Sequence, residues 1–296
     1  MKIIENFDDS PPFDVIRPAA HEIPFVFNSP HSGHDYPEAF LEASRLCENT
    51  IRRSEDSFVD ELFAAAIARG APMLRARFPR AYLDVNREPY ELDPAMIDGE
   101  LPRYANSRSP RVASGLGTIA RIVAERQEIY IDRLPLSDAM RRIEMLYKPY
   151  HAALRRILAE THVRFGHAVL IDCHSMPSVV RGQDRWRRPD FVIGDRFGTS
   201  CSDIVSDTAA RVLRGLGYSV ARNKPYAGGF ITEHYGRPAQ GLHALQVEVN
   251  RALYMDERTY ERAAGWGRLE RDIATFIDAM ADIDLGGFIP QSQAAE

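Results

Sequence analysis

The fold is indicated most clearly by the stretch VLIDCHSMP, residues 169–177, which follows Gly166. It begins as a compact apolar run, which is typical of a buried strand, and it ends in a polar cluster around His174. Residues 23–28 have the same form, because an apolar run there leads into the turn SPHSG at residues 29–33. We therefore predict two buried strands that end near a histidine, His31 in one case and His174 in the other.

Strands and helices alternate along the rest of the chain. Further strands are predicted at residues 72–75, 81–85, 191–193, 218–221 and 245–250. Helices are predicted from about Ser57, over 136–160 with a kink at Pro149, between 193 and 218 with Thr199 or Ser200 as the cap, and over 260–283. Residues 107–118 are predicted to form a loop. This order predicts an α/β fold with a mainly parallel or mixed central sheet and helices on both faces.

Length and composition favour a single domain over residues 1–296, or one domain with a small lobe. We place its core at about residues 20–283 and expect a disordered tail over residues 287–296. Hydrophobic residues form 45% of the chain and charged residues 27%, which are ordinary values for a globular protein. Global disorder is therefore excluded.

Charge and cysteine content limit the partners that we expect. A net charge of -5 offers no clustered positive charge for a phosphate backbone, so we predict no nucleic-acid partner. We also predict no membrane partner, because the sequence has no apolar run of about 20 residues. Three widely spaced cysteines fit no disulfide framework and favour a reducing, cytoplasmic location. The oligomeric state stays open, with a homo-oligomer among the options.

Two histidines and a carboxylate form a candidate metal site. His31 and His174 each follow a predicted strand, and ligands of such sheets bind beyond the carboxyl ends of the strands. A catalytic zinc typically takes three protein ligands, so a carboxylate is needed; Asp56 is the best placed, with Glu55 as its competitor. A structural interpretation stays open, in which the histidines are turn residues and Asp56 is a helix N-cap.

Two neighbours of these histidines offer weaker alternatives. His34 forms His-x-x-His with His31, but that spacing on a glycine-containing turn is weak evidence for a metal. Cys173 lies beside His174 and suggests a thiol nucleophile. A cysteine at the end of an apolar strand is, however, usually inert packing.

The predicted strand at 245–250 carries a polar row. Its odd positions are apolar, and its even positions are Gln246, Glu248 and Asn250. Because side chains alternate between the two faces of a strand, this polar row indicates either a functional site or solvent exposure.

Six motifs follow one another along the chain, and this order is more specific than any one of them. They are SPHSG at 29–33 with Tyr36-Pro37, Glu55-Asp56 with VDEL at 59–62, LDVNR at 83–87, LIDCHSMP at 170–177, GGFIT at 228–232 with HYG at 234–236, and QVE at 246–248. Together they cover roughly residues 20–255. In this order they resemble the N-formylglutamate amidohydrolase family.

The resemblance implies a zinc-exopeptidase-like fold and a metal-dependent amidohydrolase with one Zn²⁺ per chain. The implied reaction converts N-formyl-L-glutamate and water to formate and L-glutamate, as in histidine catabolism. Similar zinc hydrolases use two histidines and one acidic residue as ligands, which implies His31, Asp56 and His174 here, with Glu248 as the general base. They often take the acidic ligand from His-x-x-Glu, where this chain has His34.

The resemblance also implies a set of substrate-binding residues. Asn86 and Arg87 correspond to a pair that binds a substrate carboxylate, and a planar guanidinium suits that task. The other residues implied for substrate contact are Gly229, Thr232 and His234. For the second, side-chain carboxylate of an acidic amino acid we name Arg181, with Arg80 and Arg108 as alternatives.

The chemistry is consistent with these roles. Zinc lowers the pKa of bound water from about 16 toward roughly 7 and polarises an amide carbonyl. Glu248 can then take a proton from the water and return it to the leaving amine. Three alternatives remain: a related hydrolase of another small N-acyl amino acid, a metal-free protein that senses an acidic metabolite, and a thiol amidase that uses Cys173.

Overall fold

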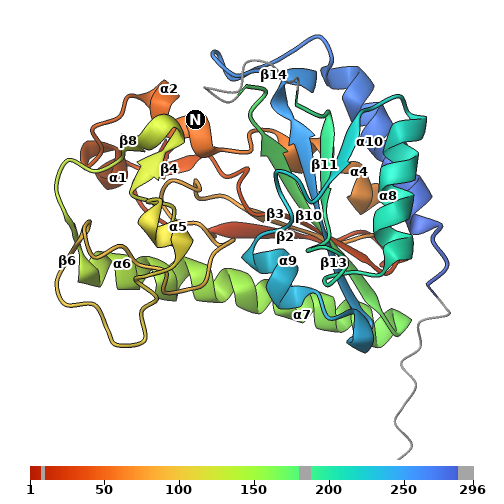
Figure 1. Cartoon of the computed structure of the whole chain (residues 1–296), viewed down its shortest axis with the longest axis horizontal. Helices are drawn as coiled ribbons and strands as arrows, with labels where there is room; N and C mark the ends of the chain where they lie inside the picture. Colours follow the sequence, from red (N-terminus) through yellow and green to blue (C-terminus); the bar gives the residue numbers. More distant parts are fainter. Residues whose placement is uncertain (8–10, 180–187, 286–296) are drawn as a thin grey trace, which may run out of the picture.

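A seven-stranded sheet forms the centre of the computed structural model, which describes residues 1–7, 11–179 and 188–285 (Figure 1). The strands lie in the order β12-β11-β13-β10-β3-β5-β2. In that order their bounds are Val220–Arg222, Phe191–Gly194, Leu242–Asn250, Ala168–Met176, Phe25–Ser29, Met73–Ala76 and Phe13–Ile16. Arg181 and the predicted tail at 287–296 lie outside the described residues.

The sheet is mixed, as the alternation of elements predicts. Strands β13, β10, β3 and β5 run parallel to one another. Strand β11 is antiparallel to β13, and β2 is antiparallel to β5. The carboxyl ends of the four parallel strands therefore meet at one edge of the sheet, where ligands of α/β proteins commonly bind.

Helices cover both faces of the sheet, which confirms the predicted α/β class. Helix α7 (Lys148–Phe165) runs beneath the sheet in Figure 1 and contacts β3 and β10. On the opposite face, α8 (Asp203–Gly215) packs against α10 (Trp266–Ala281). The hydrophobic core accordingly forms two clusters, one under α7 and the other under α8 and α10.

The alternation of side chains along β10 explains both the core and the site. Ile171 and Cys173 belong to the cluster under α8 and α10, whereas Leu170 belongs to the cluster under α7. Asp172 and His174 share the parity of Leu170, so they point to the α7 side of the sheet. The strand thus buries apolar side chains along its length and presents polar ones near its carboxyl end.

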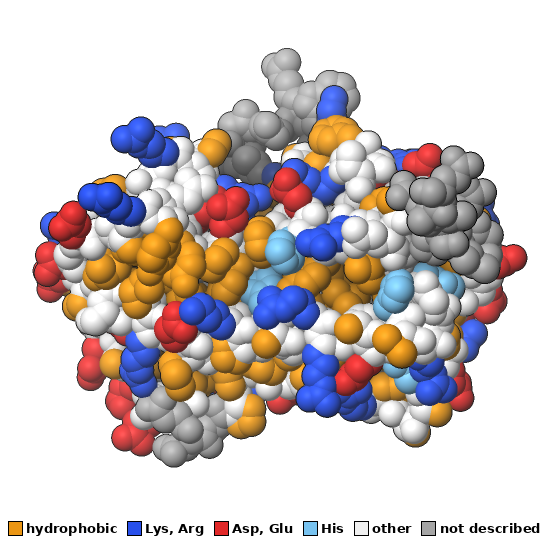
Figure 2. Space-filling view, turned by 90° about the horizontal axis from the view of Figure 1, so that it is seen from below, with side chains coloured by type: hydrophobic (Ala, Val, Ile, Leu, Met, Phe, Trp, Pro, Cys, Tyr) orange, Lys and Arg blue, Asp and Glu red, His pale blue; other side chains and the backbone are white. Residues whose placement is uncertain are grey.

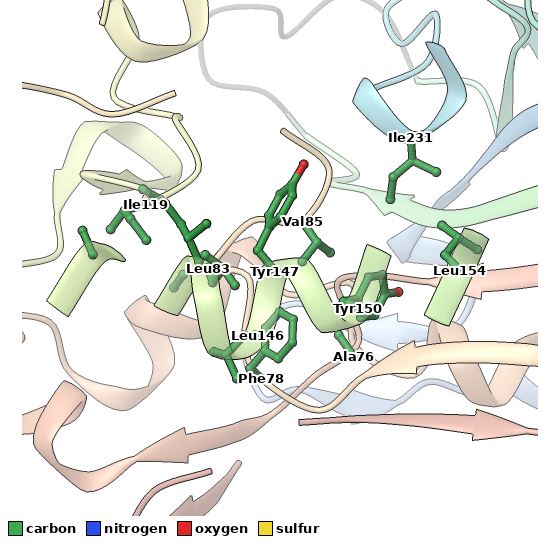
Figure 3. Packing of buried hydrophobic residues seen from close by; sticks show 14 of the residues in the cluster. Ala76, Phe78, Leu83, Val85, Ile119, Leu146, Tyr147, Tyr150, Leu154 and Ile231 are labelled. Atoms are coloured by element: carbon green, nitrogen blue, oxygen red, sulfur yellow. The ribbon is translucent and has the colours of Figure 1, made fainter. Parts of the chain in front are cut away.

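The core under α7 fixes the segments that border this polar end. Figure 3 shows Val85 between Tyr147 and Tyr150, and it shows Ile231 of α9 (Phe230–Tyr235) pointing toward Leu154 of α7. All five side chains are buried. Because protein interiors are close-packed, this contact set holds the backbone on both sides of the site in one position.

Residues 81–85, which we predicted as a strand, form an irregular buried segment instead. Leu83 and Val85 enter the core under α7, but the backbone N–H of Asp84 donates to Thr118 O in a loop, at 2.8 Å. The alternating apolar residues therefore reflect burial against a helix rather than pairing with a neighbouring strand.

Two predicted helices are interrupted. The helix predicted near Ser57 consists of α3 (Val59–Leu62) and α4 (Ala65–Ala68), and it starts after Phe58, whose φ of 65° is left-handed. The helix predicted over 136–160 consists of α6 (Leu136–Arg142), a π-helical turn (Ile143–Tyr147) and α7. The irregularity falls just before Pro149, which lacks the N–H that would bond the preceding turn.

Other boundaries differ by a few residues. Helix α8 follows Ser202 rather than Thr199 or Ser200, and α10 begins at Trp266 rather than near residue 260. The loop 107–118 contains a short helix, α5 (Pro110–Ala113). The remaining short α-helices and strands are β1 (Lys2–Ile4), β4 (Asp35–Pro37), α1 (Glu38–Glu42), α2 (Glu48–Ile51), β6 (Ile97–Asp98), β7 (Ile122–Val123), β8 (Gln127–Glu128), β9 (Leu134–Pro135), β14 (Met255–Asp256) and β15 (Glu261–Arg262). Within the described residues, no helix has both the length and the apolar character needed to cross a membrane.

Candidate active site

Three buried side chains from three separate segments meet at the carboxyl edge of the sheet. His31 follows β3, His174 lies near the end of β10, and Asp56 precedes α3. Each is at most 3% exposed, and the two imidazole rings are 4.9 Å apart between centroids. The backbone N–H of Asp56 donates to His31 O at 2.9 Å, which fixes the carboxylate segment beside the histidine turn.

The ligand atoms of these residues have the spacing of a metal site. Asp56 Oδ2 lies 3.3 Å from His31 Nδ1 and 3.0 Å from His174 Nδ1. Tetrahedral ligands held at the usual zinc distances are roughly 3.3 Å apart. His31 Nδ1 is buried and makes no hydrogen bond, so a cation would satisfy it. The three residues therefore form a group that can hold a metal ion.

A second carboxylate orients each imidazole. His31 Nε2 lies 2.8 Å from Asp84 Oδ1, and His174 Nε2 lies 2.9 Å from Asp172 Oδ2. A carboxylate accepts the proton of Nε2 and so leaves the Nδ1 lone pair free to bind a metal. The sequence analysis missed both roles, although Asp172 lies two residues before His174 and therefore on the same face of β10.

The oxygen of Asp56 that faces away from the histidines is also held. Its Oδ1 accepts hydrogen bonds from Ser175 Oγ at 2.9 Å and from Arg251 Nη2 at 3.2 Å. Burial raises the pKa of Asp56, but the two histidines outweigh that effect and hold the pKa well below its usual range. Asp56 is therefore a carboxylate, and its Oδ2 is directed at the two Nδ1 atoms.

Glu55, the competing ligand, has a structural role. Its carboxylate accepts hydrogen bonds from Tyr36 Oη at 2.6 Å and Ser57 Oγ at 2.9 Å, and it pairs with Arg52. It does not belong to the group that can hold a metal. Of the two neighbouring acidic residues, the structure places only Asp56 with the histidines.

His34 and Cys173 also lie apart from the metal group. His34 is exposed, and its Nδ1 lies 3.3 Å from Ser32 O. Cys173 is buried in the core under α8 and α10, on the opposite face of the sheet from His174, and burial raises the pKa of its thiol well above the usual range. A thiol that faces the core in this way is not a nucleophile for a ligand on the other face.

Glu248 lies opposite His174 in the paired strands β13 and β10. Gln246 Nε2 donates to Glu248 Oε1 at 2.8 Å. Burial raises the pKa of Glu248 to about 7, against the opposing effect of His174 and with a further contribution from Asp56. A carboxylate with a pKa near neutral pH can both accept and return a proton there.

A cavity of about 610 Å³ opens beside these residues. Its volume is in the range of small-molecule sites. The predicted site residues that line it are His31, Asp56, Asn86, Arg87, His174, Gly229 and Glu248. The structure therefore brings together most of the residues that the sequence analysis named, although they are scattered over more than 200 positions.

Asn86 and Arg87 are both engaged by the surrounding protein. Asn86 Oδ1 accepts from Ile231 N at 2.8 Å, and Asn86 Nδ2 lies 3.2 Å from His174 Nε2. Arg87 Nε donates to Leu116 O and Nη1 to Asn86 O, both at 2.7 Å. Burial lowers the pKa of Arg87 to about 10. The guanidinium therefore stays charged at neutral pH. Within the part of the chain that the structure describes, its Nη2 donates to no backbone carbonyl, and it lies 3.3 Å from Asp84 Oδ2.

The three residues predicted from the motif at 228–236 are Gly229, Thr232 and His234, and they lie in different surroundings at and before helix α9. Gly229 lies at the cavity, where a Cβ would be 2.4 Å from the side chain of Asn86, and its N–H donates to Gln246 Oε1 at 2.8 Å. Thr232 is fully buried and does not line the cavity. Of these three residues, only Gly229 lines the cavity.

His234 lines a separate cavity of about 450 Å³ between α7 and α9. Its ring stacks on Phe230, with centroids 4.9 Å apart. Figure 2 views the molecule from the side of α7 and shows histidine and basic side chains interspersed with hydrophobic ones across the middle of that face. The structure does not bring His234 to the other predicted site residues.

The arginines that the sequence analysis named for a second substrate carboxylate also lie apart from one another. Arg80 lines the cavity beside the candidate metal group and donates to Asp84 Oδ2 at 2.9 Å, whereas Arg108 is exposed and does not line this cavity. Arg181, the residue that we named first, lies outside the described residues. The cavity is also lined by Arg53, Arg126 and Arg251, none of which the sequence analysis named.

Comparison with known proteins agrees with this geometry. A family model described as N-formylglutamate amidohydrolase matches residues 23–255. An N-formylglutamate deformylase from Pseudomonas putida is 29% identical over 242 residues, which cover 79% of this chain and 83% of the relative. A deformylase of the same name from Pseudomonas aeruginosa is 29% identical over 239 residues, covering 80% of this chain and 84% of the relative.

Solved structures show the same relationship. A crystal structure of N-formylglutamate amidohydrolase from Ralstonia eutropha JMP134 is 37% identical, with a TM-score of 0.86 over 91% of this chain and 97% of that one. A gene product from Agrobacterium tumefaciens is 18% identical and shares the fold, with a TM-score of 0.63 over 91% of this chain and 93% of that one. On the match to the family model and the similarity to these relatives, the chain belongs to the N-formylglutamate amidohydrolase family.

Proposed function

We propose that this protein is a zinc-dependent amidohydrolase that converts N-formyl-L-glutamate and water to formate and L-glutamate. One observation carries the proposal: in a chain of this family, Asp56 Oδ2 lies within 3.3 Å of both Nδ1 atoms while Glu248 faces the same cavity. We further propose that His31, Asp56 and His174 hold one zinc ion per chain, because two imidazoles and a carboxylate suit zinc.

Zinc bound there would supply a Lewis acid, and it would lower the pKa of a bound water so that the water becomes a nucleophile able to attack an amide. The protein residues do the remaining work. Asp84 and Asp172 keep both imidazoles in the tautomer that offers Nδ1, and Ser175 and Arg251 keep Asp56 in place.

Glu248 moves the proton in this mechanism. As the water oxygen bonds to the formyl carbon, Glu248 accepts a water proton, and it delivers that proton to the amide nitrogen when the C–N bond breaks. Gln246 holds Glu248 Oε1, so Oε2 is the oxygen available for transfer. The second water proton ends on the released amine, so the products are formate and the ammonium form of glutamate, and no other reactant is required.

Arg87 and Asn86 are proposed to bind a carboxylate of the substrate. Both line the cavity, and the backbone contacts of Arg87 fix the plane of its guanidinium before the substrate arrives. Gly229 allows the loop before α9 to approach Asn86 closely. Thr232 and His234 have no part in this proposal, because neither side chain lines the cavity.

The test is a release assay on the purified protein. Formate and free amino acid are quantified for N-formyl-L-glutamate and a panel of other N-formyl and N-acetyl amino acids, before and after chelation and after zinc is restored. We expect zinc-dependent turnover with N-formyl-L-glutamate preferred. A different preferred substrate would reassign the specificity, and a protein with under a tenth of an equivalent of zinc and no turnover would instead be a metabolite sensor.

We also propose that the chain acts as one catalytic domain in the cytoplasm, in histidine catabolism. The site residues all come from one sheet and the segments that adjoin it. The three cysteines are free, which suits a reducing compartment. The role in histidine catabolism rests on the family alone.

A further inference from the structure

A β-hairpin forms one wall of the catalytic cavity. Strands β7 (Ile122–Val123) and β8 (Gln127–Glu128) pair antiparallel around a 3-10 turn, Ala124–Arg126. Residues 122–124 and Arg126 line the cavity, and Arg126 is exposed. The hairpin therefore places an exposed cation in the wall of the cavity, whereas His31, Asp56 and His174 in the same cavity are buried.

The other arginines that line the cavity each have a partner within the protein, and for Arg53 that partner is Gln127. Arg251 donates to Asp56, Ser175 and two backbone carbonyls, and Arg87 donates to two backbone carbonyls and faces Asp84. Arg80 pairs with Asp84. Among the described residues, Arg126 has no hydrogen bond or ion pair, so its guanidinium is free to bind a ligand.

The backbone at Arg126 is strained. Its φ of 60° is left-handed, a conformation that costs a residue with a side chain on the order of 1 kcal/mol or more. The adjacent Gln127 is tied back, because its Oε1 accepts from Arg53 Nη1 at 3.3 Å. Strain of this kind persists where surrounding structure imposes it, and it is common at ligand-binding sites.

The proposed substrate has two carboxylates, and Arg87 with Asn86 can bind only one of them. We propose, on the basis of the proposed function, that Arg126 binds the distal side-chain carboxylate of the substrate and so selects acidic N-acyl amino acids. A guanidinium binds a carboxylate through two parallel charge-assisted hydrogen bonds. An amide at the same position offers one neutral oxygen, so the preference for glutamate over glutamine measures this contact.

The experiment compares two substrates that differ only in that group, N-formyl-L-glutamate and N-formyl-L-glutamine. Arg126→Ala and Arg126→Lys are assayed beside Arg108→Ala, which removes an exposed arginine that does not line the cavity. We expect Arg126→Ala to lower kcat/KM for the glutamate derivative about tenfold or more, mainly through KM, and to leave the glutamine derivative within about twofold. Arg126→Lys should retain part of the preference, and Arg108→Ala all of it.

If the ratio of kcat/KM for the glutamate derivative to that for the glutamine derivative is unchanged in Arg126→Ala, the proposal is overturned. This holds also when both values fall equally, because an equal loss indicates a general disturbance of the hairpin. If Arg80→Ala alone removed the preference, the distal carboxylate would belong to Arg80.

Calorimetric titration of L-glutamate and L-glutamine into the same proteins tests Arg126 without turnover. Loss of glutamate binding in Arg126→Ala supports the assignment, and equal binding to wild type and variant rejects it. Failure of the proposed function is seen separately, because it would abolish turnover in the wild-type protein itself.

Discussion

Glu248 and His174 are register partners in the parallel strands β13 and β10, on the same face of the sheet. Neighbouring strands lie about 4.8 Å apart, so this pairing alone holds a carboxylate next to one ligand of the candidate metal site. No loop is needed to bring the two groups together. Glu248 and His174 are thus fixed relative to each other by backbone hydrogen bonds of the sheet.

Glu248→Gln is expected to lose turnover while it keeps the metal. The amide still accepts the hydrogen bond of Gln246, but it cannot take a proton. General-base catalysis contributes about 10²- to 10⁴-fold, so kcat should fall by that factor. Steady-state kinetics together with metal analysis checks this, and an undiminished rate would remove Glu248 from the role of base.

The pH profile of kcat/KM should show an acid limb governed by Glu248. Its pKa is raised to about 7, mainly by burial, and only the carboxylate form accepts a proton. Activity should therefore rise with pH and level off above about 7; a bound cation favours the carboxylate and moves the limb lower, not higher. Measurement from pH 5 to 9 tests this, and a rate that rises on acidification would contradict it.

Asp84→Asn and Asp172→Asn should weaken metal binding without removing a ligand. Each carboxylate orients one imidazole through Nε2, and loss of such partners typically costs about 10- to 100-fold in metal affinity. Competition with a chelating dye gives the affinities. Asp35→Asn is the matched control, since Asp35 is a buried carboxylate paired with Arg77 outside the cavity. Equal losses in all three variants would mean that the effect is general destabilisation.

Gly229→Ala should disturb the substrate site. The new methyl group would lie 2.4 Å from the side chain of Asn86, which cannot move freely because it also accepts from Ile231 N. We expect a higher KM and a lower melting temperature. Gly215→Ala in α8 is the control, because a Cβ there meets no atom within 4 Å. If Gly229→Ala behaved like this control, the close packing of the loop against Asn86 would be disproved.

His151 should make the fold sensitive to mild acid. Burial lowers its pKa to about 4, whereas an unfolded histidine titrates near 6.5. The unfolded chain therefore binds the proton first, and the free energy of unfolding should fall as pH drops from about 6.5 toward 4, by up to about 3 kcal/mol from this residue. Urea unfolding of wild type and His151→Gln at pH 7 and pH 4.5 measures it; equal pH dependence in both would exclude His151 as the cause.

The sequence determined the α/β class, the strand that leads to His31, the strand that carries His174, and the residue types of the site, because side-chain alternation and strand-end polarity are local properties. It could not choose between Asp56 and Glu55, since both carboxylates precede the same helix. Only the folded chain separates them: Tyr36 and Ser57 bind Glu55, whereas the imidazoles face Asp56.

The contacts of Asp84, Asp172 and Arg251 and the place of Arg126 in the cavity wall are set by tertiary structure alone. Arg251 reaches Asp56 from 195 positions away along the chain, and Asp84 reaches His31 from a segment whose apolar pattern resembled a strand. A hydrogen bond depends on distances of about 3 Å and on direction, and sequence spacing specifies neither for residues far apart in the chain. Local periodicity therefore predicted which side chains face the site, and long-range packing determined which of them touch.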